Sequence, residues 1–489
     1  MKILKNIAIG LVALATLSAC SSDYLDTEYT RYLGEEEAAS AAAQNPDVFL
    51  NGMWSWMVRY EGRHDSYGIF TIFMDTQVMG QDIAFQTSSW YNFDYQLDYR
   101  EEPYVRTSSF WTTLYTLIAK ANEVISLYPD GAETVSEKGL LGQAYAIRGM
   151  SYYYLIQIYQ DYLNADGSIN RAAPGVPIIY NNVDGKTEEE MDKAKGRNTV
   201  GDVLDEAQSD LEKSVEYLGA GYERPNKNYI DVHVANGLLA RFYLLTQQWQ
   251  KAADAAKAAR NGYSLMDNEG LHAGFNSVDN EEWMWGFHHT TETITSYASL
   301  FSHLASSGPG YGRNYPFLID AQLYSEIPES DYRKSLFNGP QGDPSQPTTG
   351  GKKPYANQKF LYNTDWLCDY MYMRAAEMVL IEAEAYAHLN NGNKAAQVLG
   401  ELMAKRQPDW SKDLVTVEDV YKQRRIELWG EGFTYFDLKR LNKGIDRSYS
   451  GSNHNYKLVV PAHDVKWTFQ LPRSEMQENT HIDASEQNK

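Results

Sequence analysis

One spacing of small and large residues occurs twice in the chain and constrains its fold more than any other feature. The two sets are Ala240, Tyr243, Ala252, Ala256 and Ala259, and Ala383, Tyr386, Ala395, Leu399 and Leu402. In each set the later residues follow the first by 3, 12, 16 and 19 positions, with a short polar turn between them. Such spacing lets two antiparallel helices approach closely where their small residues meet. The sequence therefore predicts helix pairs of the tetratricopeptide-repeat type, with a third pair formed by 139–160 and 200–218.

The predicted fold is mostly α: a tetratricopeptide-repeat helical scaffold with a loop-rich, aromatic ligand-binding region and a few short strands. We expect the helical repeats near 111–262 and 371–442. The stretches 45–110 and 265–370 are rich in aromatic residues and show no sustained period, and we expect most of the loops there. Long loops on a rigid frame commonly carry function.

The N-terminus has the pattern of an exported lipoprotein. Residues 1–19 combine two early lysines, an apolar run and small residues, and Cys20 follows them. This order is typical of a signal peptide whose cleavage leaves an acylated Cys20, although an ordinary secretory signal with an incidental cysteine is the alternative. Residues 20–33 are polar, and we expect a tether there, ahead of a single domain at 34–489. With Cys20 lipidated, Cys368 has no partner for an intramolecular disulfide.

The charge of the chain excludes some partners. Its 65 acidic and 44 basic residues give a formal net charge of −21. A field of that sign repels a phosphate backbone, so we expect no nucleic acid partner, and it disfavours anionic lipid beyond the anchor. The 37 tyrosines and 11 tryptophans suggest a different ligand, because exposed aromatic rings are surfaces on which sugars stack. Tyrosine is also a common core residue, which is the alternative.

The densest group of charges lies at 424–440, RRIELWGEGFTYFDLKR. Its charged residues include Arg425, Glu427, Glu431, Asp437 and Arg440. Two glycines interrupt the run and predict a break between two helices. Charges among so many aromatic residues must be paired. Because the stretch offers no nucleophile, we interpret it as a structural ion-pair network rather than as an acid–base active site.

Patterns for catalysis, cofactors or metals are weak. No histidine begins an H-E-x-x-H zinc motif, and residues 184–187 (DGKT) lack the first glycine of a phosphate loop. Residues 164–170 resemble part of a calcium loop, but Tyr162 and Ala173 occupy its first and last ligand positions. We therefore expect a turn there, and no cofactor or metal. The many acidic residues leave glycoside cleavage open, because some pair could have the required separation.

Four motifs along the chain match one family. The strongest is residues 423–440, with Gln423-Arg424-Arg425-x-Glu427, Glu431-Gly432 and the run from Tyr435 to Arg440. The others are 20–26 (CSSDYLD), 373–386 (MRAAEMVLIEAEAY) and 469–475 (FQLPRSE). Together they resemble the RagB/SusD family of outer-membrane glycan-binding lipoproteins. The chain departs from the family pattern at Gln423 and Thr434, where Glu and Arg are usual.

The resemblance implies a non-catalytic protein, lipid-anchored in the outer membrane and facing the cell exterior. Such proteins bind oligosaccharide or polysaccharide and deliver it to a SusC-like TonB-dependent transporter. The resemblance also assigns glycan binding to Trp90, Tyr91 and Asn92. Tyrosines around a glycine-rich loop are candidates for the opposite wall: Tyr297, Tyr311 and Tyr315. Two alternative functions remain, a surface glycoside hydrolase and a peptide- or protein-binding repeat scaffold for uptake.

Overall fold

The computed structural model describes residues 47–59, 62–87, 89–293 and 297–489. The chain divides at Val48, and the second unit, Phe49–Lys489, holds almost all of the described residues. The predicted signal peptide, Cys20 and the boundary at residue 34 lie outside the described residues. The second unit is mostly helical with few short strands, as predicted.

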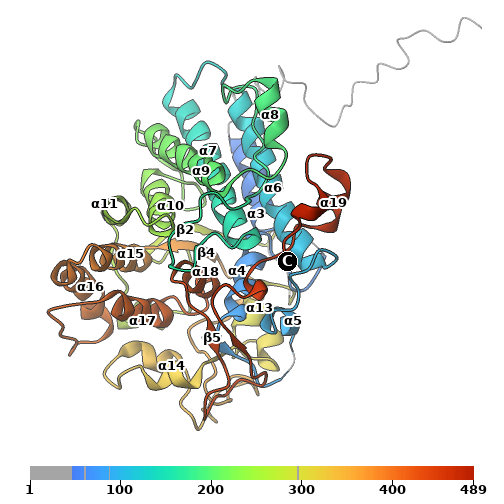
Figure 1. The fold of residues 1–489 in the computed structure, drawn as a ribbon. Helices are drawn as coiled ribbons and strands as arrows, with labels where there is room; N and C mark the ends of the chain where they lie inside the picture. The colour runs from blue at the N-terminus through green and yellow to red at the C-terminus, as the bar shows by residue number, and fades with distance from the viewer. Residues whose placement is uncertain (1–46, 60–61, 88, 294–296) are drawn as a thin grey trace, which may run out of the picture. The chain divides into compact units, whose positions relative to one another are not determined.

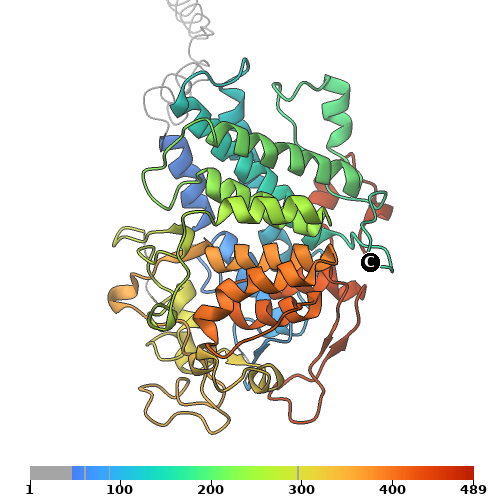
Figure 2. The ribbon, with the colours of Figure 1, turned by 90° about the vertical axis from the view of Figure 1, so that its left-hand side faces the viewer.

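A stack of packed helices forms the scaffold (Figure 1). Its members are α6 (Val105–Ser126), α7 (Val135–Tyr159), α9 (Val200–Leu218), α10 (Val232–Leu245), α11 (Trp249–Ala259), α15 (Ala375–His388), α16 (Gly392–Arg406) and α17 (Val417–Glu427). Neighbours along the stack contact each other: α6 with α7, α7 with α9, α9 with α10, α10 with α11, α11 with α15, and α15 with α16 and α17. Figure 2 shows the α10–α11 pair beside the α15–α16 pair.

The predicted small residues lie at these helix contacts. Ala240, Ala252 and Ala256 are fully buried in the α10–α11 pair, and Ala383 and Ala395 are fully buried in the α15–α16 pair. The third predicted pair is confirmed as α7 with α9.

Threonine caps fix where several of these helices begin. Thr134, Thr199 and Thr416 each accept a hydrogen bond from the backbone three residues on, and the acidic side chain at that position accepts one in return. Each such capping box satisfies backbone groups that the first helical turn leaves open.

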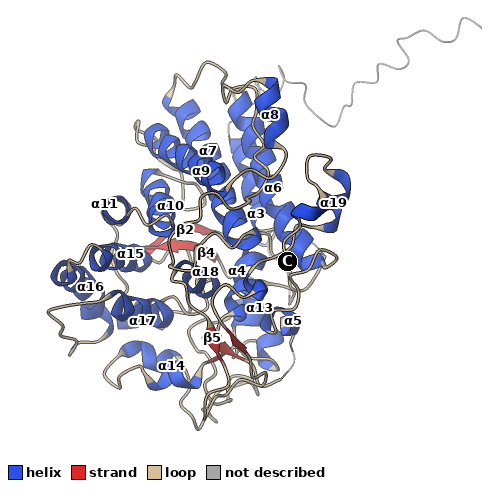
Figure 3. Cartoon of the chain, viewed as in Figure 1, coloured by secondary structure: helices blue, strands red, loops and turns tan. Residues whose placement is uncertain are grey.

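Shorter elements connect the scaffold (Figure 3). The remaining helices are α3 (Asp47–Met57), α4 (Ile69–Met79), α5 (Asn92–Tyr95), α8 (Glu188–Ala194), α12 (Asn268–Leu271), α13 (Leu300–Leu304), α14 (Ala321–Ser325), α18 (Thr434–Arg440) and α19 (Arg473–Glu478). Short 3-10 helices are η2 (Tyr311–Arg313), η3 (Tyr332–Leu336), η4 (Thr364–Trp366), η5 (Val465–Trp467) and η6 (Ala484–Glu486). Antiparallel strand pairs in the described residues are β1 (Ile83–Ala84) with β3 (Leu318–Ile319), β2 (Trp283–Phe287) with β4 (Tyr370–Arg374), and β5 (Ile445–Asp446) with β6 (Val459–Val460).

The expectation that most of the loops lie in 45–110 and 265–370 is wrong in part for the first stretch, because α3 and α4 occupy much of it. Ten of the eleven residues of α4 are buried, so the helix shows no polar face and no amphipathic period in the sequence. Its C-terminal end is held by the buried Arg447, which donates to the carbonyls of Val78 at 3.0 Å and Met79 at 2.9 Å. These bonds satisfy carbonyls that a helix end leaves open.

A buried arginine ties α9 to α7, and one carboxyl beside it has a raised pKa. Arg148 donates to Asp210 at 2.7 and 2.8 Å and to Asp184 at 2.9 and 3.0 Å, and it reaches Glu206 at 3.3 Å. Burial, together with the charge of Asp210, raises the pKa of Glu206 to about 7. Three carboxylates around one guanidinium therefore leave excess negative charge when all are ionised.

We expect Glu206→Gln to stabilise the protein at about pH 8 and to change little at about pH 4. A raised folded-state pKa means that Glu206 favours folding at low pH, and that this contribution is lost as the pH rises toward 7. Above that pH the ionised carboxylate costs about 2 kcal/mol, which glutamine removes, so the Tm should rise by a few degrees. Thermal melts of both proteins at the two pH values measure this. Equal Tm shifts at both would contradict it.

Candidate functional site

Four ring-bearing residues lie together, here called the aromatic cluster: half-buried His64 and Tyr311, and exposed Trp90 and Tyr297. The centre of the His64 ring lies 5.2 Å from that of Trp90, 5.3 Å from that of Tyr297 and 5.9 Å from that of Tyr311. Trp90 and Tyr297 are 45% and 53% exposed. Large aromatic side chains in a folded protein usually bury most of their surface, so an open cluster is a candidate binding surface.

Segments far apart in the sequence build the aromatic cluster. His64 lies between α3 and α4, Trp90 lies just before α5, and Tyr311 is the first residue of η2. Tyr297 precedes α13. Three of the predicted glycan-binding residues, Trp90, Tyr297 and Tyr311, thus meet in space.

The other three predicted glycan-binding residues have different surroundings. Tyr91 is fully buried, with its ring 5.1 Å from that of His303 and 5.8 Å from that of Phe317, so it cannot stack on a ligand in this structure. The chain turns into α5 here and directs Trp90 outward and Tyr91 inward.

Asn92 is half-buried, and its amide makes no side-chain hydrogen bond with the described residues. Tyr315 is 39% exposed, and its N–H donates to the Tyr311 carbonyl at 2.9 Å.

His64 is fixed at both its side chain and its backbone. The Tyr311 hydroxyl shares a hydrogen bond with Nδ1 of His64. The His64 carbonyl accepts hydrogen bonds from the Tyr67 hydroxyl and from Nε2 of His303, the latter at 2.8 Å. Burial lowers the pKa of His303 to about 4, so this imidazole is neutral near pH 7 and Nε2 carries its proton.

A buried charge cluster lies next to these segments and ties them together. Arg106 is 1% exposed and contacts three carboxylates, Asp65 at 2.9 Å, Asp75 at 2.8 Å and Asp94 at 2.8 Å. Asp65 follows His64, and Asp94 lies four residues after Trp90. Burial, reinforced by Asp94 and Asp65, raises the pKa of Asp75 well above its usual range, which reduces the negative charge enclosed there. Arg106 thereby links the segments that carry His64 and Trp90.

Other hollows of the protein fit a sugar less well. Two cavities have volumes of about 20 and 40 Å³, room for little more than water. An open groove of about 430 Å³ beside α8 is lined by Ile178, Ile179, Tyr180, Glu188, Met191, Asp192 and Lys195, with one aromatic ring among them. The aromatic cluster is therefore the stronger candidate.

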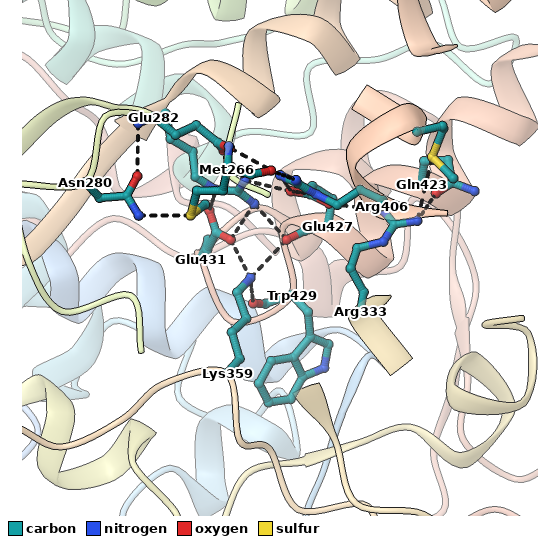
Figure 4. Close-up of polar contacts among 12 residues, drawn as sticks. Met266, Asn280, Glu282, Arg333, Lys359, Arg406, Gln423, Glu427, Trp429 and Glu431 are labelled. Carbon is teal, nitrogen blue, oxygen red and sulfur yellow. Dashed lines mark hydrogen bonds and ion pairs between the residues drawn. The ribbon is translucent and has the colours of Figure 1, made fainter. Parts of the chain in front are cut away.

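Most charged side chains of 424–440 lie in ion pairs, those of Glu427 and Glu431 among them (Figure 4), whereas buried Lys439 donates hydrogen bonds to backbone carbonyls. Glu427 accepts hydrogen bonds from Arg333, Arg374 and Arg406 at 2.7–3.1 Å. Arg374 also donates to Glu431 at 2.8 and 2.9 Å. This set, here called the Glu427 network, contains four acids and four bases: Glu282, Asp331, Glu427 and Glu431, and Arg333, Lys359, Arg374 and Arg406. The equal numbers allow so many charges to be buried together.

A second network joins α18 to α17 and α15. Asp437 accepts hydrogen bonds from Arg424 at 2.9 Å and Arg440 at 2.8 Å. Burial opposes ionisation of Glu384, but Arg440, His388 and Arg424 hold the pKa of this carboxyl well below its usual range. The predicted helix break occurs between α17 and α18, at two glycines with φ of 80° and 90°. Arg425 pairs separately with Asp82 at 2.7 Å.

The described part of the chain shows neither a metal-binding arrangement nor a membrane-spanning helix. No group of three or more His, Cys, Asp or Glu side chains is arranged there to hold a metal ion. In the calcium-like stretch, Asp166 instead accepts hydrogen bonds from the backbone and hydroxyl of Ser168, as in a turn. No helix among the described residues has the length and apolar character needed to cross a membrane.

Sequence reasoning missed His64 and Arg106. Both contact residues distant in the sequence, and neither belongs to a recognisable motif. The available signal was the loop stretch RHD at 63–65, in which a histidine lies between opposite charges.

Two family models match the chain. One, described as "Starch-binding associating with outer membrane", matches residues 23–244, and the other, described as "SusD family", matches residues 353–483. SusD-like protein P2 of Formosa agariphila is 22% identical over 396 residues, which are 69% of this chain and 72% of that protein.

Solved structures share the fold. A SusD-like carbohydrate binding protein from Bacteroides vulgatus has a TM-score of 0.77 at 25% identity, over 91% of this chain and 98% of that one. Surface glycan-binding protein A from Bacteroides uniformis has a TM-score of 0.64 at 18% identity, over 91% and 99% of the two chains. Because the two family models match both ends of the helical scaffold and related structures superpose over most of its length, this chain belongs to the SusD/RagB family.

Proposed function

We propose that this protein is a non-catalytic, lipid-anchored receptor that binds a glycan at the cell surface. It passes oligosaccharides to a SusC-like TonB-dependent transporter in the outer membrane. The observation that carries the proposal is the aromatic cluster, in which exposed Trp90 and Tyr297 flank a fixed histidine. The apolar C–H faces of a pyranose pack on such rings, and nearby polar atoms hydrogen-bond its hydroxyls.

The family context supports the ligand class and the location. One matching family model is described as starch-binding and associated with the outer membrane, and two structural relatives are named as carbohydrate- or glycan-binding proteins. The signal peptide pattern ending at Cys20 supports a lipid anchor.

The carboxylates near the aromatic cluster support a binding role rather than hydrolysis. Glycoside cleavage uses two carboxyl groups that both reach the scissile bond. Asp65 and Asp94 are 2% exposed, and both are occupied by Arg106. Neither carboxylate is therefore free to serve as acid or nucleophile.

A binding screen of the mature, acyl-free chain tests the function. Affinity electrophoresis through gels containing laminarin, starch, xylan, alginate or polygalacturonate should retard the protein in at least one gel. Incubation with the same polysaccharides should release no reducing sugar. Migration unaffected by all of them, or steady release of reducing ends, would contradict the proposal.

A further inference from the structure

Acidic residues are missing from the segments that build most of the aromatic cluster. The chain has 65 acidic residues in 489, but none in 297–319, which carries Tyr297 and Tyr311. There is also none in 83–93, which carries Trp90. In a chain with a net charge of −21, this gap sets the aromatic cluster apart from the rest of the sequence.

The acids that border these segments face inward. Asp82, Asp94 and Asp320 are 0–2% exposed and engaged by Arg425, Arg106 and His454 respectively. Asp65, next to His64, is also buried and paired. Among the described residues, the exposed carboxylate closest in sequence to the aromatic cluster is Glu292, five positions before Tyr297, and Glu61, three positions before His64, lies outside the described residues.

Cationic and hydrogen-bonding groups remain at the surface of the same segments. Arg313 is exposed in η2, two residues after Tyr311, and forms no ion pair with the described residues. Arg63 is 40% exposed at its side chain and holds Asp65 through Nε and Nη2. Because Tyr311 occupies Nδ1 of His64, Nε2 is the ring nitrogen left for a ligand.

We propose that the glycan bound at the aromatic cluster is anionic, with uronate carboxylates or sulfate esters, and that Arg313 and His64 recognise its charged groups. The inference rests on the proposed glycan-binding function. A guanidinium binds carboxylate or sulfate oxygens with paired N–H donors. The net charge of the chain repels an anionic ligand, so such a ligand needs a site cleared of acids, whereas a neutral sugar does not.

Matched polysaccharides that differ only in charge test the proposal. One pair is polygalacturonate and its fully methyl-esterified form, and the other is a sulfated galactan and its desulfated form. The first pair detects uronate recognition and the second sulfate recognition. The full mature chain should bind the charged member of at least one pair at least about tenfold more tightly than its neutral partner, with affinity falling as salt rises.

Variants assign the preference to residues. Arg313→Gln should remove most of the preference for the charged form, and His64→Phe, which keeps a ring, should weaken binding of it. Arg171→Gln is the control, because Arg171 is exposed and pairs with Asp205 outside the aromatic cluster. Melting curves should match the wild type for both arginine variants.

Three results would overturn the inference. If the wild type binds laminarin or starch through Trp90 and ignores both charged probes, the ligand is neutral and only the glycan-binding function survives. If it binds none of these glycans, both proposals fail. If Arg313→Gln and His64→Phe leave charge discrimination intact, the assigned residues are wrong.

Discussion

Replacing Glu427 with glutamine is expected to destabilise the protein by about 3–5 kcal/mol, which is a large share of the stability of a typical domain. Glu427 is 2% exposed and accepts hydrogen bonds from Arg333, Arg374 and Arg406. Glutamine has nearly the same volume but no charge, so four buried cations would face three carboxylates. Urea unfolding of the purified variant, together with its soluble yield, measures the loss.

Glu418→Gln is the matched control, since Glu418 lies on the same helix, α17. Its side chain is 69% exposed and pairs with Lys443 at 2.8 Å. Exposed pairs of this kind contribute about 0–1 kcal/mol, so the control should unfold close to the wild type. A Glu427→Gln protein that unfolds at the same urea concentration as this control would show that the Glu427 network is not needed for stability.

Trp90→Ala is expected to weaken glycan binding by about 10- to 100-fold and to leave the melting transition unchanged. The indole is 45% exposed, so its removal takes little from the core. It contributes a large flat surface for stacking, and aromatic residues of this kind dominate the energetics of many binding sites. Isothermal titration calorimetry measures the change. The ligand is an oligosaccharide prepared from a polysaccharide that retards the wild type.

Tyr456→Ala provides the comparison for Trp90→Ala. Tyr456 is 40% exposed and lies outside the aromatic cluster. Its loss should leave affinity within about twofold of the wild type. An equal loss of affinity in both variants would mean that Trp90 contributes no more to binding than an exposed aromatic residue elsewhere. The site assignment would then be wrong.

Most of the fold prediction rests on the spacing of small residues within short stretches of the sequence. The helix pairs α10–α11 and α15–α16 could be predicted because the small residues that define them are close together in sequence. Helix α4 was missed because its polar residues are buried along with its apolar ones, so its sequence shows no exposed polar face at the helical period.

The ion-pair partners show the limit of local reasoning. Helical spacing sets Glu427 one turn from Gln423 and from Glu431, whereas the structure pairs it with Arg333, Arg374 and Arg406 from other parts of the chain. Burial of the stretch could be inferred from its composition, but partners that arrive through tertiary folding could not.

The candidate site was only partly predictable. The family resemblance identified Trp90, and the glycine-rich loop pointed to Tyr297 and Tyr311; the three lie together in the structure. The resemblance also selected Tyr91, but this residue is buried, since neighbours along a turn can face opposite ways. His64 could not be found from sequence, since its contact with Tyr311 spans 247 positions.

The most direct test of the account is a crystal structure of the mature chain with an oligosaccharide of the glycan that it binds. A sugar ring should pack against Trp90 and Tyr297, with a polar atom of the ligand within hydrogen-bond distance of Nε2 of His64. An oligosaccharide seated elsewhere on the protein, with the faces of Trp90 and Tyr297 uncovered, would contradict it.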